Sequence, residues 1–94
     1  MRGISIHSEV LSSTGNTTIL NCAGMYIKNN GSATVKYGFT DNGGVHILQA
    51  GQEREINFPA GFLFSGKLYL YFVSSGTKEL AIDKYIENNE ETIL

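Results

Sequence analysis

The sequence of 94 residues contains few of the residues that cross-link or stiffen small domains. It contains one cysteine, Cys22, one proline and no tryptophan. A single cysteine excludes an internal disulfide, so the fold does not depend on an oxidising compartment. Because His7 and His46 lie far apart in the chain, they and Cys22 do not have the spacing of a zinc site.

Charged residues are also scarce. They make up 17% of the chain, the formal net charge is −2, and the seven Lys and Arg residues are scattered. This pattern provides no basic patch for a phosphate backbone. The start of the chain lacks the apolar region of a secretory signal, and no segment approaches the ~20 apolar residues of a membrane span. We therefore expect a soluble protein whose partners are neither nucleic acid nor a membrane.

Turn-forming and strand-forming residues are abundant. The eleven glycines and the many Asn, Ser and Thr residues separate short apolar segments that alternate with a period of two. We predict an all-β chain, a single antiparallel β-sandwich of the jelly-roll or immunoglobulin-like type with about seven short strands. The sandwich domain is expected over residues 1–87, followed by a C-terminal arm at 88–94. The expected strands are 3–11, 17–28, 33–40, 45–48, 53–58, 67–73 and 80–86.

The alternation also predicts which side of each strand is buried. Ile4, Ile6 and Val10 share one parity and indicate a half-buried first strand. In the second strand Leu20 and Cys22 fall on one face, together with Thr18, Gly24 and Tyr26, and Gly24 is expected at a bulge or a close approach of backbones. In the third strand Ala33, Val35, Tyr37 and Phe39 are expected to face the core.

Three other segments suggest further structure. Residues 29–32, with the letters NNGS, are typical of a type I′ hairpin turn. Residues 67–73 are apolar on both parities, which predicts a central strand covered on both faces. For residues 80–86 we predict a strand, although Ile82, Tyr85 and Ile86 also have helical spacing.

A search for catalytic groups yields no site. Cys22, His7 and His46 each fall in a predicted strand without a flanking nucleophile motif, so Cys22 is expected to be a buried apolar residue and the histidines structural. Residues 41–44, with the letters DNGG, lack the later glutamate of a calcium loop and are expected to form a turn. Glu53 and Glu55 share a face, which is expected to be an exposed edge. We therefore predict no enzyme activity, no metal and no cofactor; a small enzyme would depend on His7, His46 or Glu53.

Three segments of the middle of the chain resemble one family. They are VKYGFTDNG at 35–43, LQAGQEREINFP at 48–59 and FSGKLYL at 64–70. Over residues 34–85 they resemble small β-sandwich virion-associated proteins of tailed bacteriophages. The resemblance implies an auxiliary capsid, head-fibre or tail component that acts by assembly, located in the virion and assembled in the host cytoplasm. It also implies a homo-oligomer, by analogy a trimer, and other virion proteins as partners.

Two groups of residues are candidates for contacts between subunits. The first is tyrosines, which are enriched at interfaces: Tyr69, Tyr71 and Tyr85. The second is the apolar tip of the arm, Ile93 and Leu94, which we expect to dock on a neighbouring subunit. The alternative function is a small carbohydrate-binding module that uses the tyrosines and polar loops, although such modules are expected to use tryptophan.

Overall fold

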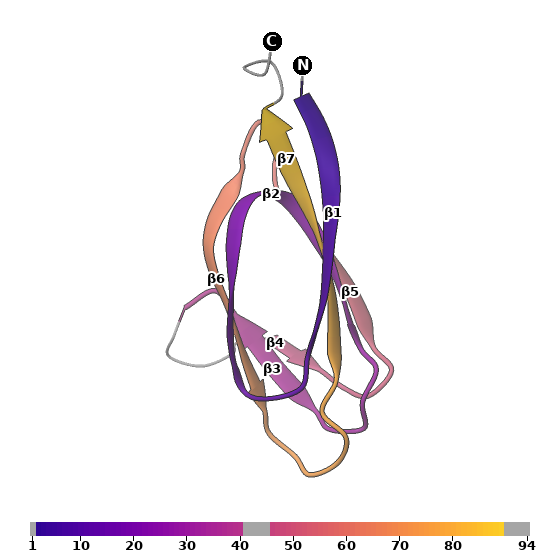
Figure 1. The fold of residues 1–94 in the computed structure, drawn as a ribbon. Coiled ribbons are helices and arrows are strands. Elements are labelled where there is room, and N and C mark those ends of the chain that lie inside the picture. Colours follow the sequence, from indigo (N-terminus) through magenta and orange to yellow (C-terminus); the bar gives the residue numbers. More distant parts are fainter. Residues whose placement is uncertain (1, 41–45, 90–94) are drawn as a thin grey trace.

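The computed structural model describes residues 2–40 and 46–89, which form seven β-strands and no helix (Figure 1). Every strand pairing among them is antiparallel. The predicted all-β antiparallel fold with about seven strands is confirmed. The strands are β1 (Arg2–Leu11), β2 (Gly15–Asn29), β3 (Val35–Gly38), β4 (His46–Leu48), β5 (Glu53–Asn57), β6 (Phe64–Phe72) and β7 (Leu80–Asn89).

The strands belong to one sheet that is folded about β2. Their order is β1-β7-β2-β6-β3-β4, and β5 also pairs with β2. Residues 15–22 of β2 pair with β6, whereas residues 22–29 pair with β7 and, over 24–28, with β5. In Figure 1, β2 rises beside β6, arches over below the upper ends of β1 and β7, and descends beside β7. The two parts of the sheet are therefore continuous through β2, and in the described part of the chain only β3 and β4 pair directly with a neighbour in sequence.

The arch of β2 changes which parity of its side chains is buried. Asn21 has a left-handed φ of 51°, and the register shifts between residues 19 and 22 and again between 22 and 24. Ile19 before the shifts, Cys22 between them and Met25 after them are all fully buried, whereas Leu20 is 60% exposed. The prediction that Leu20 and Cys22 share a buried face is therefore wrong, because each bulge moves the alternation by one residue. Cys22 is nevertheless fully buried.

The expected close approach at Gly24 is confirmed, because a Cβ there would lie 2.9 Å from the Ile56 carbonyl oxygen.

One apolar core lies between the two parts of the sheet. Its fully or nearly fully buried side chains come from β2, β3, β4, β6 and β7 and include Ile19, Met25, Ile27, Val35, Tyr37, Leu48, Leu68, Leu70, Leu80 and Ile82. The inward face predicted for Val35 and Tyr37 is confirmed. On β6, however, Leu68 and Leu70 are buried while Tyr69 and Tyr71 are only half-buried. This strand lies between β2 and β3 but is fully covered on one face only, so the predicted cover on both faces is wrong.

Residues 29–32 do not form the predicted hairpin turn. β2 and β3 have no pairing with each other, since β3 pairs with β4 and β6. The backbone N–H groups of residues 30–33 instead donate to the carbonyl oxygens of Thr77 and Glu79, at 2.9–3.2 Å. Gly31 is required here for space, because a Cβ would overlap the Thr77 carbonyl oxygen and lie 2.9 Å from the Glu79 nitrogen. The NNGS segment thus crosses between two strands at a corner in which Asn29 and Gly31 are buried.

The exposed side of β1 is opposite to the predicted one. Ile4, Ile6 and Val10 are 58%, 64% and 60% exposed, whereas Glu9 and Leu11, of the other parity, point inward. The reason is electrostatic: Glu9 neutralises the buried ammonium of Lys84, and an unpaired charge there would cost several kcal/mol. Since alternate residues of a strand point to opposite faces, the three apolar side chains must then face solvent.

The last strand confirms the predicted strand at 80–86 and extends it. β7 pairs with all of β1, from Leu11↔Leu80 to Arg2↔Asn89, so it enters the segment 88–94 predicted as an arm. Residues 90–94, including Ile93 and Leu94, lie outside the described residues. No helix that could cross a membrane occurs in residues 2–40 and 46–89.

Candidate functional site

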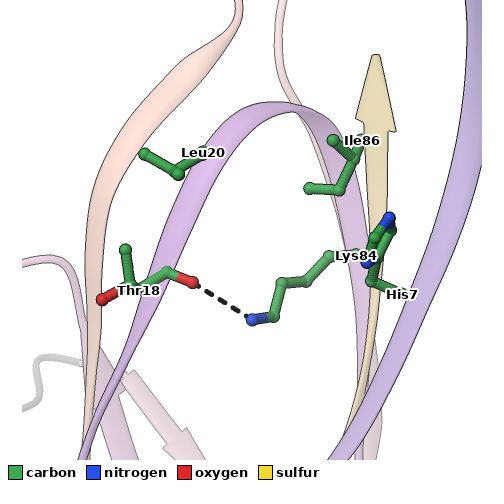
Figure 2. Close-up of a pocket in the computed structure, with 5 residues that line it drawn as sticks. All are labelled: His7, Thr18, Leu20, Lys84 and Ile86. Carbon is green, nitrogen blue, oxygen red and sulfur yellow. Dashed lines mark hydrogen bonds between the residues drawn. The ribbon is translucent and has the colours of Figure 1, made fainter. Parts of the chain in front are cut away.

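A buried lysine links the two sides of the β2 arch. Lys84 of β7 is 7% exposed, and its Nζ lies 2.6 Å from Oε2 of Glu9 on β1. The same ammonium donates hydrogen bonds of 3.1 Å to Thr17 Oγ1 and to the Thr18 carbonyl oxygen on β2, the second of which is drawn in Figure 2. Three partners match the three N–H donors of an ammonium group. Lys84 therefore joins β1, β7 and β2, and no donor remains for an anion.

A hollow of about 320 Å³ lies beside this lysine, under the arch. In Figure 2, Leu20 and Ile86 lie on its two sides and His7 lies close to Lys84. The fifth lining residue is Thr18. The volume is at the lower limit of small-ligand sites, about 300 Å³. Its walls are mostly apolar and the Lys84 ammonium already has three partners, so we assign no chemistry to it.

The ion pair predicts a specific loss of stability in acid. Partial burial alone would raise the pKa of Glu9, but hydrogen bonds from Lys84 and Thr17 and the Lys84 charge outweigh it, so its folded-state pKa lies below the ordinary value of 4.5. A lowered folded-state pKa contributes stability that is present above pH 4.5 and is lost as the pH falls through the folded-state value. We expect urea unfolding of Glu9→Gln to lose less stability than wild type between pH 6 and pH 3, by about 1 kcal/mol because solvent reaches part of the carboxylate.

Exposed Glu55 provides the matched control. Glu55→Gln should keep the wild-type dependence on pH. Parallel profiles for wild type and Glu9→Gln would show that this ion pair does not contribute to stability.

The second candidate site is the outward face of β1, which we call the β1 edge and define as Ile4, Ile6, Ser8 and Val10. β1 is the end strand of the sheet and pairs only with β7 in the described chain. Its pairing runs over ten residues without a register shift, and the β1 edge carries no charge. A long, regular, apolar end strand is a template for pairing with another chain. Near the top of Figure 1, β1 lies at the margin of the molecule.

The other end strands lack this character. β4 has only three residues, and β5 carries three consecutive charged residues, 53–55. Short length and charge are the usual protections of an end strand against further pairing. Among the described end strands, β1 is thus the one open to a partner.

The structure does not bring the predicted interface tyrosines together. Tyr69 and Tyr71 are half-buried on β6, on the side away from buried Leu68 and Leu70. Tyr85 is half-buried on β7, directly opposite Ile6 in the β1–β7 register. β6 and β7 pair with different halves of β2. Of the three tyrosines, Tyr85 therefore adjoins the β1 edge, and the other two belong to the part of the sheet that contains β6.

The groups considered for nucleophilic chemistry are also separate. Burial raises the pKa of the Cys22 thiol, outweighing backbone hydrogen bonds at Gly24 and Tyr85 and the nearby Lys84 charge. The thiol donates a hydrogen bond to the Gly24 carbonyl oxygen. His7 lies on β1, whereas His46 on β4 stacks against Tyr37 with ring centroids 5.1 Å apart. Strands β1 and β4 do not pair with each other. The Cys22 thiol is directed to the backbone at Gly24 rather than to a histidine.

The predicted carboxylate pair lies on the solvent side of β5. Glu53, Arg54 and Glu55 are all exposed, and Glu53 and Glu55 pair in register with Lys28 and Tyr26 of β2. A hydrogen bond to Glu53 raises the pKa of Tyr26. Residues 41–44 lie outside the described residues. Among the residues that are described, no group of three or more His, Cys, Asp and Glu side chains could hold a metal ion.

Two features of the site escaped the sequence analysis. The burial of Lys84 leaves no local signal, because its partners Thr17 and Thr18 are more than sixty residues away. For β1 the sequence pattern is ambiguous. Ile4 and Ile6 lie on one face and the polar residues Ser5, His7 and Glu9 on the other, and the alternation does not say which face points to the core. The tertiary contacts of the inward parity, Glu9 with Lys84 and Leu11 with the apolar core, decide which parity faces inward.

Compared with protein-family models, with curated proteins and with solved structures, the chain matches none.

Proposed function

We propose that the chain is a non-enzymatic structural protein that is built into a bacteriophage particle as a decoration, head-fibre or tail component. The observation that carries this proposal is the β1 edge, where Ile4, Ile6 and Val10 are 58–64% exposed on an unprotected end strand. Apolar side chains gathered on one exposed strand favour a protein partner. The resemblance of residues 34–85 to phage virion proteins supports a virion as the assembly.

The partners under this proposal are other copies of the chain and other virion proteins. Function then depends on surfaces, and the saturated Lys84 centre serves to hold β1 in the orientation that turns its apolar side outward. The hollow beside Lys84 is lined by no Tyr, Phe or Trp. It therefore lacks the stacking platform that the alternative of a carbohydrate-binding module would need.

The test is whether the chain is a constituent of particles. Particles purified by density gradient from cultures that produce the protein should contain it in a fixed ratio to the major shell protein, measured by quantitative mass spectrometry. The ratio should persist after a high-salt wash, because apolar contacts are not screened by salt. A chain that stays in the soluble fraction and is absent from washed particles would contradict the proposal.

A further inference from the structure

We propose that the β1 edge binds a second copy of this chain, with the two β1 strands paired antiparallel about a two-fold axis. This inference rests on the proposed function and specifies the first contact in assembly. Each copy would contribute β1, β7, β2 and β5, so that an eight-stranded sheet continues through the dimer. The first contact is then two-fold, rather than the three-fold contact suggested by analogy with virion proteins.

The first observation in favour of a second copy is the apolar pattern of the β1 edge. In an antiparallel pair with matching outward faces, even-numbered residues stand opposite even-numbered residues. Three registers near the middle of β1 place Ile6 of one copy opposite Ile4, Ile6 or Ser8 of the other. In each of these registers at least one pair of large apolar side chains meets across the axis. A two-fold contact needs such self-complementarity, since each surface meets itself.

The second observation is charge. Ile4, Ile6, Ser8 and Val10 are uncharged, and Glu9 points inward to Lys84 of its own chain. Two copies that meet along residues 4–10 therefore bring no like charges opposite each other. By contrast, β5 would place Glu53, Arg54 and Glu55 against their own copies, and equal charges directly opposite are destabilising.

The third observation is area. Three side chains that are about 60% exposed offer on the order of 100 Å² of apolar surface each. Two copies together therefore offer at most on the order of 600 Å² of apolar side-chain surface, of which edge-to-edge pairing covers only part, so the contact is smaller than the standard specific complex of about 1,200 Å² or more. A contact of this size predicts a weak, reversible dimer that leaves the remaining surfaces free for other contacts.

The experiment compares the two ends of the sheet in the full-length chain. Ile6 and Ile47 are both exposed isoleucines, at 64% and 51%, on end strands β1 and β4. Sedimentation velocity should show wild type passing from monomer to dimer with rising concentration. Ile6→Lys should raise the dimer dissociation constant at least tenfold, whereas Ile47→Lys should leave it unchanged. Circular dichroism and melting of both variants should match wild type, because both positions face solvent.

A second measurement places the contact. In all three registers Ile6 lies opposite its own counterpart or one diagonal step away, about 7–8 Å. Ile6→Cys should therefore be joined into dimers by a short bismaleimide, whereas Ile47→Cys and wild type, whose Cys22 is buried, should not. Unchanged dimerisation of Ile6→Lys, or a wild-type chain that is monomeric at every concentration, would overturn the proposal. If only Ile47→Lys dissociated the dimer, β4 and not β1 would be the contact, and presence in particles would still support the proposed function.

Discussion

Replacement of Gly31 by alanine is expected to destabilise the protein by about 3 kcal/mol, the upper end of the usual cost of overpacking. The added Cβ would overlap the Thr77 carbonyl oxygen and press on the Glu79 nitrogen at 2.9 Å. Both are backbone atoms, so a change of rotamer cannot relieve the contact. The same two residues accept the four hydrogen bonds from residues 30–33 that hold the corner before β3. Separating the segments to admit a methyl group would stretch all four.

Gly15→Ala is the matched control, because a Cβ at Gly15 meets no atom within 4 Å. This substitution should be neutral or stabilising by up to about 1 kcal/mol, since alanine restricts the unfolded chain more than glycine does. Thermal unfolding followed by circular dichroism would separate the two, with Gly31→Ala melting roughly 12–24 °C lower at about 4–8 °C per kcal/mol. Equal melting temperatures for the two variants would show that the corner yields without cost.

Asn29→Ala is expected to cost about 3 kcal/mol through the loss of buried hydrogen bonds. Asn29 is fully buried at the end of β2. Its Nδ2 donates to the carbonyl oxygens of Ala33 at 2.8 Å and Leu48 at 3.0 Å, and its Oδ1 accepts from the Gly31 nitrogen at 3.1 Å. Alanine leaves two buried acceptors and one donor without this partner. The side chain joins the end of β2, the corner before β3 and the end of β4, so all three should loosen together.

Two further variants make this test specific. Asn30→Ala, one residue along the chain at an exposed position, should change the free energy of unfolding by less than about 0.5 kcal/mol. Asn29→Asp keeps the shape of the side chain but removes both amide donors and adds a buried charge. It should be at least as unstable as Asn29→Ala at neutral pH and recover in part as the carboxyl is protonated. A urea midpoint for Asn29→Ala close to that of wild type would mean that water replaces the amide.

Both expectations concern a segment that the sequence pattern described incompletely. The letters NNGS at 29–32 are typical of a tight turn, and the chain does change direction there. The structure differs from the prediction in the hydrogen-bond partners of this segment. Local propensity includes no information on residues 77–79, which lie more than forty positions away and supply the hydrogen bonds. The sequence does not distinguish a glycine that is required because another backbone lies close from a glycine that is required for a positive φ.

The candidate site was likewise predicted only in part from the sequence. Cys22 was expected to be buried and is buried, but through a bulge at Asn21 that reverses the parity on which the expectation was based. The pattern of Ile4, Ile6 and Val10 indicated a strand with one apolar side, which is correct. The same pattern suggested that the apolar side faces the core. That expectation is wrong, because the contacts of the opposite side orient the strand.

The sequence by itself determined the class of the fold. Period-two alternation, frequent turn residues and the lack of a long helical pattern are local properties, and they were enough to predict seven antiparallel strands, including the strand at 80–86. Tertiary structure decided the side that β1 turns to solvent, the folding of one sheet about β2, and the meeting of residues 31 and 77. The physical reason is that alternation separates two faces of a strand without saying which is inner. That choice is made by distant partners, and for β1 the partner is the buried charge of Lys84, which must be neutralised by Glu9.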